Sequence, residues 1–323
     1  MTDIADRTKL ALRAAQLYYL RDLKMKAIAD SLNMSRSSVS RLLSYARDTG
    51  LVDIRIKQPI DGISRLQHEI RMRDGVTAYI IPASTGMSAR ERGTQVARHA
   101  GRILSAMIES STVIGVAWGN TMAGVSRHLV GRPLTDVTVV QLNGAAYGEN
   151  FGLGYVGDIL ERFAEAYNAH VEPLPVPAFF DDPQTKTVLW RERSIARILA
   201  LQQRIDVAVF GVGDPHSEIP GHVYRNGYLS PSDHEELAAA DVVGDVATVF
   251  LRGDGTHAGI RLNERSSGPD LDTLRRAPRR VCIVSDPGRI PALRGALAAG
   301  LVTDLIIDEH TARGIASTYV QGA

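Results

Sequence analysis

The chain has 323 residues, enough for two domains, and its composition of 44% hydrophobic and 23% charged residues is that of an ordinary soluble globular protein. No run approaches the ~20 apolar residues of a membrane-spanning helix, and the first residues lack the apolar segment of a signal peptide, so we expect a cytoplasmic protein without a membrane partner. The single cysteine, Cys282, excludes a disulfide framework within the chain, and in the stretch RRVCIVS it is expected to be a buried strand thiol.

The charge is unevenly distributed along the chain. Residues 1–60 hold eleven Lys and Arg and six Asp and Glu, a balance of +5, which leaves −4 for the rest of a chain whose net charge is +1. A solvated basic face is the commoner reason for so mild an excess. A basic N-terminal region also suits contact with nucleic acid, and the helices predicted there favour that interpretation.

Three amphipathic segments predict three helices in this basic region. They run from Thr8 to Arg21, from Lys24 to Leu32 and from Ser35 to Asp48. Asn33 tolerates the left-handed conformation that a tight turn needs, and Ser35 can then cap the third helix. This arrangement is typical of the helix-turn-helix, whose second helix enters the major groove of DNA, although a generic three-helix bundle would share the pattern.

The third predicted helix begins with many serines. Residues 35–40 read SRSSVS, and serine is a mediocre helix former. Val39, Leu42 and Ala46 nevertheless lie on one apolar stripe, so we expect a helix whose other face meets a polar partner. Hydroxyl and guanidinium groups suit phosphates and base edges. The residues expected to contact double-stranded operator DNA are Ser35, Arg36, Ser37, Ser38, Ser40 and Arg41.

A turn and one further helix are expected before the second domain. Residues 58–62, QPIDG, break the chain, and the apolar residues of Ile63 to Arg73 are spaced for one helix face. We therefore expect a helix-turn-helix domain over 1–59, a linker helix over 60–75 that could lie at a dimer contact, and an effector-binding domain over 76–323.

From residue 76 onward, apolar runs of strand length alternate with helical stretches, which predicts a doubly wound, mainly parallel α/β domain. The runs are TAYIIPA, STVIGVAW, VTVVQLN, DVAVFGVG, VATVFL, RRVCIVS and TDLIIDE. Ligands bind such sheets where strand ends meet turns and helix starts. Small and polar turn residues follow these strands at WGNT, NGAA, GVGDP and SDPGR, and at Gly244-Asp245 before VATVFL, so a pocket is expected at this edge.

No cofactor or metal motif is expected. His216 stands where a dinucleotide fingerprint requires its third glycine, and the chain lacks a phosphate loop of the Walker type. His216, His222 and His234 fit no zinc spacing, so a surface or loop role is the better interpretation of all three.

The segment LYYLRDLKMKAIADSLNMSRSSVSRLLSYARDTGLV resembles the DNA-binding region of the SorC family of bacterial sugar-sensing transcriptional regulators, with its L-Y-Y, I-A-x-x-L and S-x-x-x-V-S-R-L-L-x-x-A-R motifs in that order. The resemblance implies a recognition helix at Ser35 to Asp48, followed by a short strand at Leu51 to Lys57. The later segments GVAWGNT, GVGDP, GDVATVFLRGDG and RVCIVSDPGRIPALRGALAAG are similar to the effector domain of that family, so nearly the whole chain is covered.

The resemblance also implies a fold related to sugar-phosphate isomerases and a site for a small sugar, sugar phosphate or polyol. The site residues that it carries over are Gly119, Asn120, Thr121, Asn143, Gly144, Gly213, Asp214 and Asp245. Arg289 replaces the lysine of the G-G-x-x-K pattern common in the family, and we add it to the site. A guanidinium favours a phosphorylated effector, whereas pairing with Asp286 would leave a site for an uncharged polyol. Without a pocket lysine, the effector is expected to bind reversibly.

Two functions remain open from the sequence. The preferred one is an effector-controlled DNA-binding regulator and not an enzyme; because one helix reads one half-site, a homodimer or homotetramer is expected. The alternative is an isomerase-like enzyme with a DNA-binding appendage. Its candidate acid and base groups would be Asp214, Asp245, Glu309 and His310.

Overall fold

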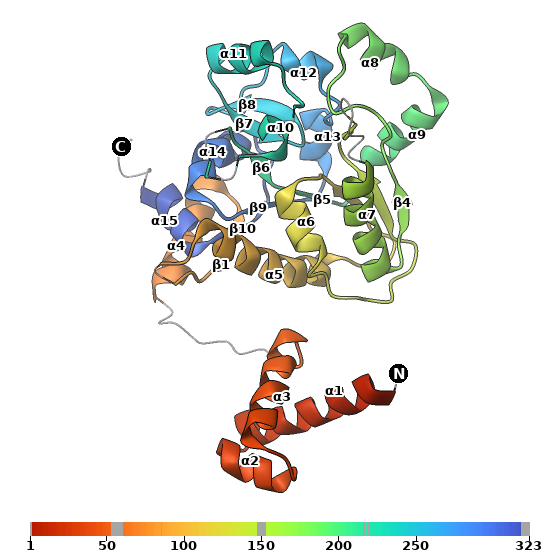
Figure 1. The fold of residues 1–323 in the computed structure, drawn as a ribbon. Helices are drawn as coiled ribbons and strands as arrows, with labels where there is room; N and C mark the ends of the chain where they lie inside the picture. Colours follow the sequence, from red (N-terminus) through yellow and green to blue (C-terminus); the bar gives the residue numbers. More distant parts are fainter. Residues whose placement is uncertain are drawn as a thin grey trace. The chain divides into compact units, whose positions relative to one another are not determined.

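A computed structural model describes residues 2–52, 61–84, 86–146, 153–215, 217–218, 220–225 and 227–317. The chain divides into two compact units, Met1–Ile60 and Asp61–Ala323 (Figure 1), and each is considered by itself. Within the described ranges, no helix is long and apolar enough to cross a membrane.

The first unit is a bundle of short helices. Its elements are α1 (Thr2–Ala15), the π-helix η1 (Gln16–Leu20), α2 (Met25–Ser31) and α3 (Arg36–Asp48). Helices α1 and α2 both pack against α3. Their contact is made of small and branched apolar side chains, namely Ala11, Ala14, Ala15, Ile28, Ala29, Val39, Leu42, Leu43 and Ala46. The strand expected at Leu51 to Lys57 falls almost wholly on residues 53–60, outside the described residues.

The turn between α2 and α3 confirms the sequence prediction. Asn33 has φ 53°, in the left-handed region that asparagine tolerates. Met34 donates its backbone N–H to the Ala29 carbonyl at 2.9 Å, and the Ser35 hydroxyl accepts a hydrogen bond from the Ser38 N–H at 3.2 Å. Ala29 is buried at the crossing, where a larger side chain would hold the two helices apart.

The second unit contains a seven-stranded sheet in the order β1-β10-β9-β5-β2-β3-β4. All of its pairings are parallel, which confirms the doubly wound α/β prediction. The strands are β1 (Thr77–Ile81), β2 (Val113–Val116), β3 (Thr138–Gln141), β4 (His170–Glu172), β5 (Val207–Phe210), β9 (Arg279–Val284) and β10 (Asp304–Asp308). Of these, the sequence missed only β4, a three-residue strand at the edge of the sheet.

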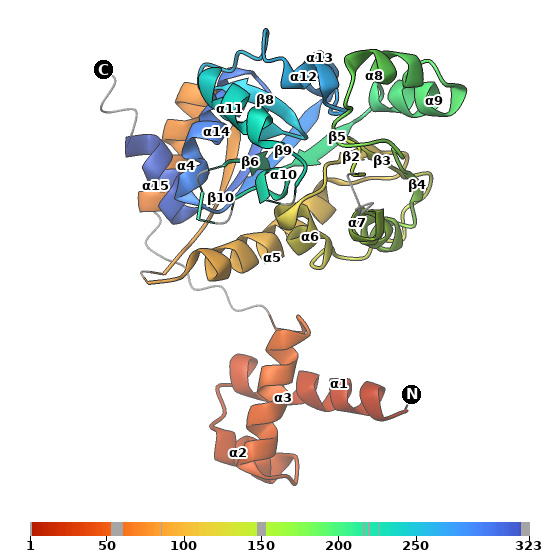
Figure 2. The ribbon, with the colours of Figure 1, turned by 45° about the horizontal axis from the view of Figure 1, so that its top comes forward.

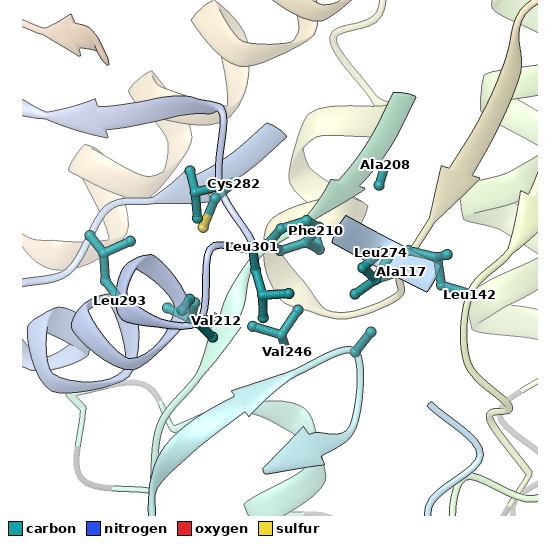
Figure 3. Close-up of a cluster of buried hydrophobic side chains, with 14 of the residues drawn as sticks. Ala117, Leu142, Ala208, Phe210, Val212, Val246, Leu274, Cys282, Leu293 and Leu301 are labelled. Carbon is teal, nitrogen blue, oxygen red and sulfur yellow. The ribbon is translucent and has the colours of Figure 1, made fainter. Parts of the chain in front are cut away.

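Helices cover both faces of this sheet (Figures 1 and 2). One face carries α5 (Ala89–Met107), α6 (Asn120–Ser126) and α7 (Leu153–Tyr167). The other carries α4 (Asp61–Asp74), α9 (Arg193–Gln202), α13 (Leu271–Arg276), α14 (Ile290–Ala298) and α15 (Glu309–Ser317). Figure 3 shows part of this second core, in which Cys282 is the buried strand thiol that the sequence predicted. Burial raises the pKa of Cys282 to about 12.

One expected strand belongs to a different sheet. The run VATVFL was predicted as a parallel strand, but it contains the turn of an antiparallel hairpin. The hairpin consists of β7 (Val242–Val246) and β8 (Val249–Arg252), joined by Ala247 and Thr248. Both turn residues have positive φ, 47° and 67°, as a two-residue hairpin turn requires. Gly244 and Asp245 therefore lie within β7 and not in a turn, which corrects the sequence prediction. With β6 (Val212–Gly213) the hairpin forms a three-stranded sheet that packs on α14 (Figure 2).

Five short elements complete the second unit. They are α8 (Pro183–Leu189), α10 (His222–Arg225), α11 (Pro231–Ala239), α12 (Leu262–Arg265) and the 3-10 turn η2 (Pro287–Arg289).

Helix α4 is part of the second unit. It corresponds to the helix expected at Ile63 to Arg73, but it packs on β1 and α15 instead of standing between two domains. Its Leu66 and Ile70 are 7% and 0% exposed within the core shared with the sheet. The structural boundary between the units thus precedes this helix.

Candidate functional site

The exposed face of α3 carries most of the residues expected to meet DNA. Arg36, Ser37, Ser40 and Arg41 are exposed and recur at intervals of three and four, so they share one face of the helix. Ser35 lies at the N-cap, where its hydroxyl is 2.8 Å from that of Ser37 and 2.9 Å from that of Ser38. Ser38 itself is half-buried.

Side chains of α1 and η1 contact α3 near its C-terminal end. Arg47 donates hydrogen bonds to the Tyr19 hydroxyl and to the Ser44 hydroxyl, both at 3.1 Å. Arg7 lies over the ring of Tyr45 with its guanidinium carbon 4.4 Å from the ring centroid. The arginines that point away from the bundle are thus distinct from those that stabilise it.

In the second unit, a cavity lies where the sheet edge meets the hairpin and η2. It encloses about 540 Å³, part of it open to solvent. Its floor includes Ala117 and Val212, which also belong to the apolar core shown in Figure 3. Seven of the nine predicted effector-site residues line it: Gly119, Asn120, Thr121, Asn143, Gly213, Asp245 and Arg289. Segments far apart in the sequence therefore meet at one place, as the parallel topology predicts.

The other two predicted residues do not line the cavity and instead support its walls. The Gly144 N–H donates to the Ser267 hydroxyl at 3.0 Å, and a Cβ at Gly144 would lie 2.4 Å from the Val176 carbonyl oxygen, so only glycine fits there. Asp214 is buried, and its Oδ1 accepts a hydrogen bond from the Ser217 N–H at 2.9 Å.

Two buried oxygen atoms of cavity residues have no hydrogen-bond partner within the described part of the chain. They are Oδ1 of Asn143 and Oδ1 of Asp245, on residues that are 2% and 6% exposed. The other carboxylate oxygen of Asp245 accepts from the Thr248 N–H at 3.0 Å across the hairpin turn. Burial is the main reason that the pKa of Asp245 rises to about 6. Buried acceptors of this kind require donors from a ligand or water.

Arg289 enters the cavity from η2 and is 9% exposed. Its Nη1 donates to the Thr121 hydroxyl at 3.4 Å and to the Val212 carbonyl at 3.3 Å. Burial lowers the pKa of Arg289, while the nearby carboxylates, first Asp286 and then Asp214 and Asp245, oppose that shift. The guanidinium therefore lies among three acidic side chains.

Four aromatic residues that the sequence analysis did not select as site residues gather at the cavity, and two of them, Trp118 and His222, line it. His222 was expected to have a surface or loop role, but this prediction was wrong, because it lines the cavity and stacks on Tyr155 with ring centroids 5.2 Å apart. Trp118 lies 5.8 Å from His222 and 5.4 Å from Tyr228, centroid to centroid. Burial lowers the pKa of His222. Four separate segments supply these rings, so no linear motif could have revealed them.

Trp118 is oriented by the strand end opposite it. Its indole N–H is shared between the Asn143 carbonyl at 3.1 Å and the Gly144 carbonyl at 2.9 Å. Tyr228 likewise donates to the Ala145 carbonyl at 3.1 Å. Backbone carbonyls of the turn after β3 thus orient both rings, of which Trp118 lines the cavity.

The candidate acid and base groups of an isomerase do not come together. Glu309 and His310 line a different hollow near α15, and Glu309 pairs with Arg313. Lys186 lies in α8, 5.7 Å from the Trp190 ring centroid, and no lysine is among the residues that line the cavity. The described residues also include no group of three His, Cys, Asp or Glu that could hold a metal ion.

The fold and the cavity define a class of protein: a helix-turn-helix unit joined to an α/β ligand-binding unit. Comparison with known proteins agrees. Residues 58–317 match the family described as "Putative sugar-binding domain", and the chain belongs to this family. The resemblance to SorC-type regulators is thereby confirmed.

Relatives match over almost the whole chain. The deoxyribonucleoside regulator of Bacillus subtilis (strain 168) is 28% identical over 96% of this chain and 98% of its own length. The sorbitol operon regulator of Klebsiella pneumoniae is 23% identical over 95% of this chain and 98% of its own length.

Solved structures show the same fold. A domain of "a possible sugar-binding transcriptional regulator" from Arthrobacter aurescens TC1 is 48% identical, covers 80% of this chain and 100% of its own, and has a TM-score of 0.75. The full-length sorbitol operon regulator SorC from Klebsiella pneumoniae covers 96% of this chain and 98% of its own, with 23% identity and a TM-score of 0.77. The relatives named here are transcriptional regulators.

Proposed function

We propose that this protein binds operator DNA through α3 and changes its affinity for DNA when a small sugar, sugar phosphate or polyol enters the cavity beside Arg289. The observation that carries the proposal is the convergence of six segments, far apart in the sequence, on one cavity with unpartnered buried acceptors. On the DNA side, support comes from the exposed Arg36 and Arg41 on a helix whose opposite face is packed in the bundle.

Symmetric DNA recognition is part of this proposal. A single recognition helix covers one half-site, so two copies related by two-fold symmetry are needed for an operator with two half-sites. A homodimer or homotetramer in the cytoplasm satisfies this requirement.

The protein is proposed to act as a regulator without turning over its effector. An isomerase needs a base and a polarising partner positioned on the same substrate. Of the four candidate groups, Asp245 lines the cavity, Asp214 is engaged with Ser217 beside it, and Glu309 and His310 lie in another hollow. Because Asp245 alone of these four groups lines the cavity, the arrangement supports binding better than catalysis by them.

The test uses full-length protein and a labelled DNA fragment that flanks its own gene. Fluorescence anisotropy should show saturable binding that a subset of sugars, polyols or sugar phosphates shifts, and the same compounds should raise the thermal stability of the protein because they bind the native state. Ribose 5-phosphate and fructose 6-phosphate incubated with the protein should remain unchanged. Steady turnover of either compound would instead support the enzyme alternative.

A further inference from the structure

The charge inside the effector cavity is the starting point. Among the described residues that line it, Arg289 is the only Lys or Arg and Asp245 the only Asp or Glu. Asp286 and Asp214 lie beside the same guanidinium without lining the cavity, and both are buried, 8% and 2% exposed. With all four groups ionised, three negative charges surround one positive charge, a local balance of −2.

Asp245 contributes to this negative charge at neutral pH. Its pKa is about 6, so its carboxylate is mostly ionised there. His222 adds no positive charge at neutral pH, because burial lowers its pKa below the ordinary value. A dianionic phosphate placed beside Arg289 would therefore meet more negative than positive charge in a poorly solvated site.

Two buried acceptors at the cavity suit a ligand that donates hydrogen bonds. They are Oδ1 of Asn143 and Oδ1 of Asp245, the latter beside the hydroxyl of Tyr224, while Nε of Arg289 is a donor at the same cavity. A hydroxyl group can donate to each, whereas an ionised phosphate has only acceptors. The aromatic wall of Trp118 and His222 offers surfaces against which the C–H groups of a carbon chain or sugar ring can pack.

We propose that the effector is an uncharged polyol or sugar and that the cavity discriminates against its phosphomonoester. The inference rests on the proposed function, because it specifies the effector of the same site. It reverses the preference that Arg289 alone gave at the level of sequence, because three acidic side chains act on the same guanidinium.

A second hollow shares Asn120, Thr121 and Arg289 with the cavity, and it holds further basic side chains that a phosphate could use. Arg90 and Arg127 also line it, and both are exposed. Exposed charges are screened by solvent and salt, so they contribute less to binding than buried ones. The test therefore includes these two arginines as the competing anion site.

The first experiment compares matched pairs by titration calorimetry on the full-length protein: erythritol with erythritol 4-phosphate, ribitol with ribitol 5-phosphate, glucitol with glucitol 6-phosphate, and ribose with ribose 5-phosphate. In the pair that binds, the neutral member should bind at least about tenfold more tightly. Tighter binding of the phosphorylated member would overturn the inference and leave the proposed function intact. Binding by no member of any pair would contradict both.

A variant of an acidic residue beside Arg289 tests the physical cause. Asp286 accepts from the Gly288 N–H at 2.9 Å through Oδ1, and asparagine keeps that acceptor while removing the charge. Asp286→Asn should therefore reduce the discrimination against the phosphorylated member of the pair, whereas Asp158→Asn, which removes an exposed carboxylate of α7, should not. Unchanged discrimination in Asp286→Asn would show that the acidic cluster does not cause it.

A third experiment uses inorganic phosphate as the probe, so it does not require the effector to be known. At matched ionic strength, phosphate should not raise the melting temperature of the protein in a saturable way. A saturable rise that the double variant Arg90→Gln/Arg127→Gln abolishes would place an anion site in the second hollow and overturn the inference.

Discussion

Gly213 of β6 and Asp245 of β7 face each other as sheet partners, and a Cβ at Gly213 would lie 1.9 Å from Oδ1 of Asp245. The missing side chain at position 213 thus leaves the space that the unpartnered carboxylate oxygen occupies. Glycine is required here because of this close approach and not because of its backbone angles.

Gly213→Ala is expected to weaken effector binding at least about tenfold, since Asp245 must turn away from the place where it meets the ligand. The matched control is Gly157→Ala in α7, where an added Cβ meets no atom within 4 Å. That control should bind effector normally and gain up to about 1 kcal/mol in stability, because alanine is the better helix former. Equal affinity of Gly213→Ala and the parent would show that Asp245 does not contact the effector.

The exposed arginines of α3 allow a prediction about DNA binding. Arg36→Ala and Arg41→Ala should each weaken operator binding. If the arginine contacts a base, the loss should be about 1–3 kcal/mol and the sequence specificity should relax. If it contacts a phosphate, affinity should fall by a similar amount for all DNA sequences and depend less on salt. Anisotropy titrations at several salt concentrations distinguish the two cases. Arg65→Ala, which removes an exposed arginine of α4, is the control for general loss of charge. If both α3 variants bound like the parent, α3 would not be the recognition helix.

Much of the second unit could be predicted because its strands consist of continuous apolar runs such as STVIGVAW, which are typical of parallel sheets buried on both faces. The hairpin could not be predicted, because its turn residues Ala247 and Thr248 are not the Gly, Asn or Asp that are typical of a turn with positive φ. As a result, the sequence assigned VATVFL to the wrong sheet. It still selected Asp245 as a site residue, because that residue remains close to the strand ends.

The serines at the start of α3 show both the strength and the limit of local patterns. Ser35 was expected both to cap the helix and to meet DNA, and the structure confirms the cap, with Ser37 and Ser38 hydroxyls beside it. These three serines therefore have a local role in the helix start. By contrast, the aromatic cluster of Trp118, Tyr155, His222 and Tyr228 depends on contacts between distant segments, which no residue spacing encodes.

The raised pKa of Asp245 predicts a pH dependence of stability. In the unfolded chain its carboxyl should titrate near the ordinary value of 3.8, and in the folded protein at about 6. Its contribution to the free energy of unfolding is therefore complete below about pH 4 and is lost as the pH rises through about 6, because the fold favours the protonated form.

Urea unfolding of the parent and of Asp245→Asn between pH 4 and pH 7 measures this contribution. Asparagine does not titrate, so the stability of the parent relative to the variant should fall by about 3 kcal/mol over that interval, from about two pKa units at 1.36 kcal/mol each. Tyr224, Asp214 and Arg289 face Asp245 in both proteins, so their own effects largely cancel. A difference that stays constant with pH would refute the assignment.

The position of α4 leads to a prediction about where the ligand-binding unit begins. Leu66 and Ile70 of this helix are buried in the core of the second unit, and α4 packs on β1 and α15. Burying one such side chain contributes about 1.5–3 kcal/mol, so the pair should contribute roughly 3–6 kcal/mol, a large share of the stability of a typical domain.

Residues 61–323 should therefore fold alone and bind effector without binding DNA. Residues 76–323, which lack α4, should be less stable by that amount or fail to fold, and thermal unfolding of the two fragments measures the difference. Equal stability of the two would show that α4 is an appendage and not part of the domain.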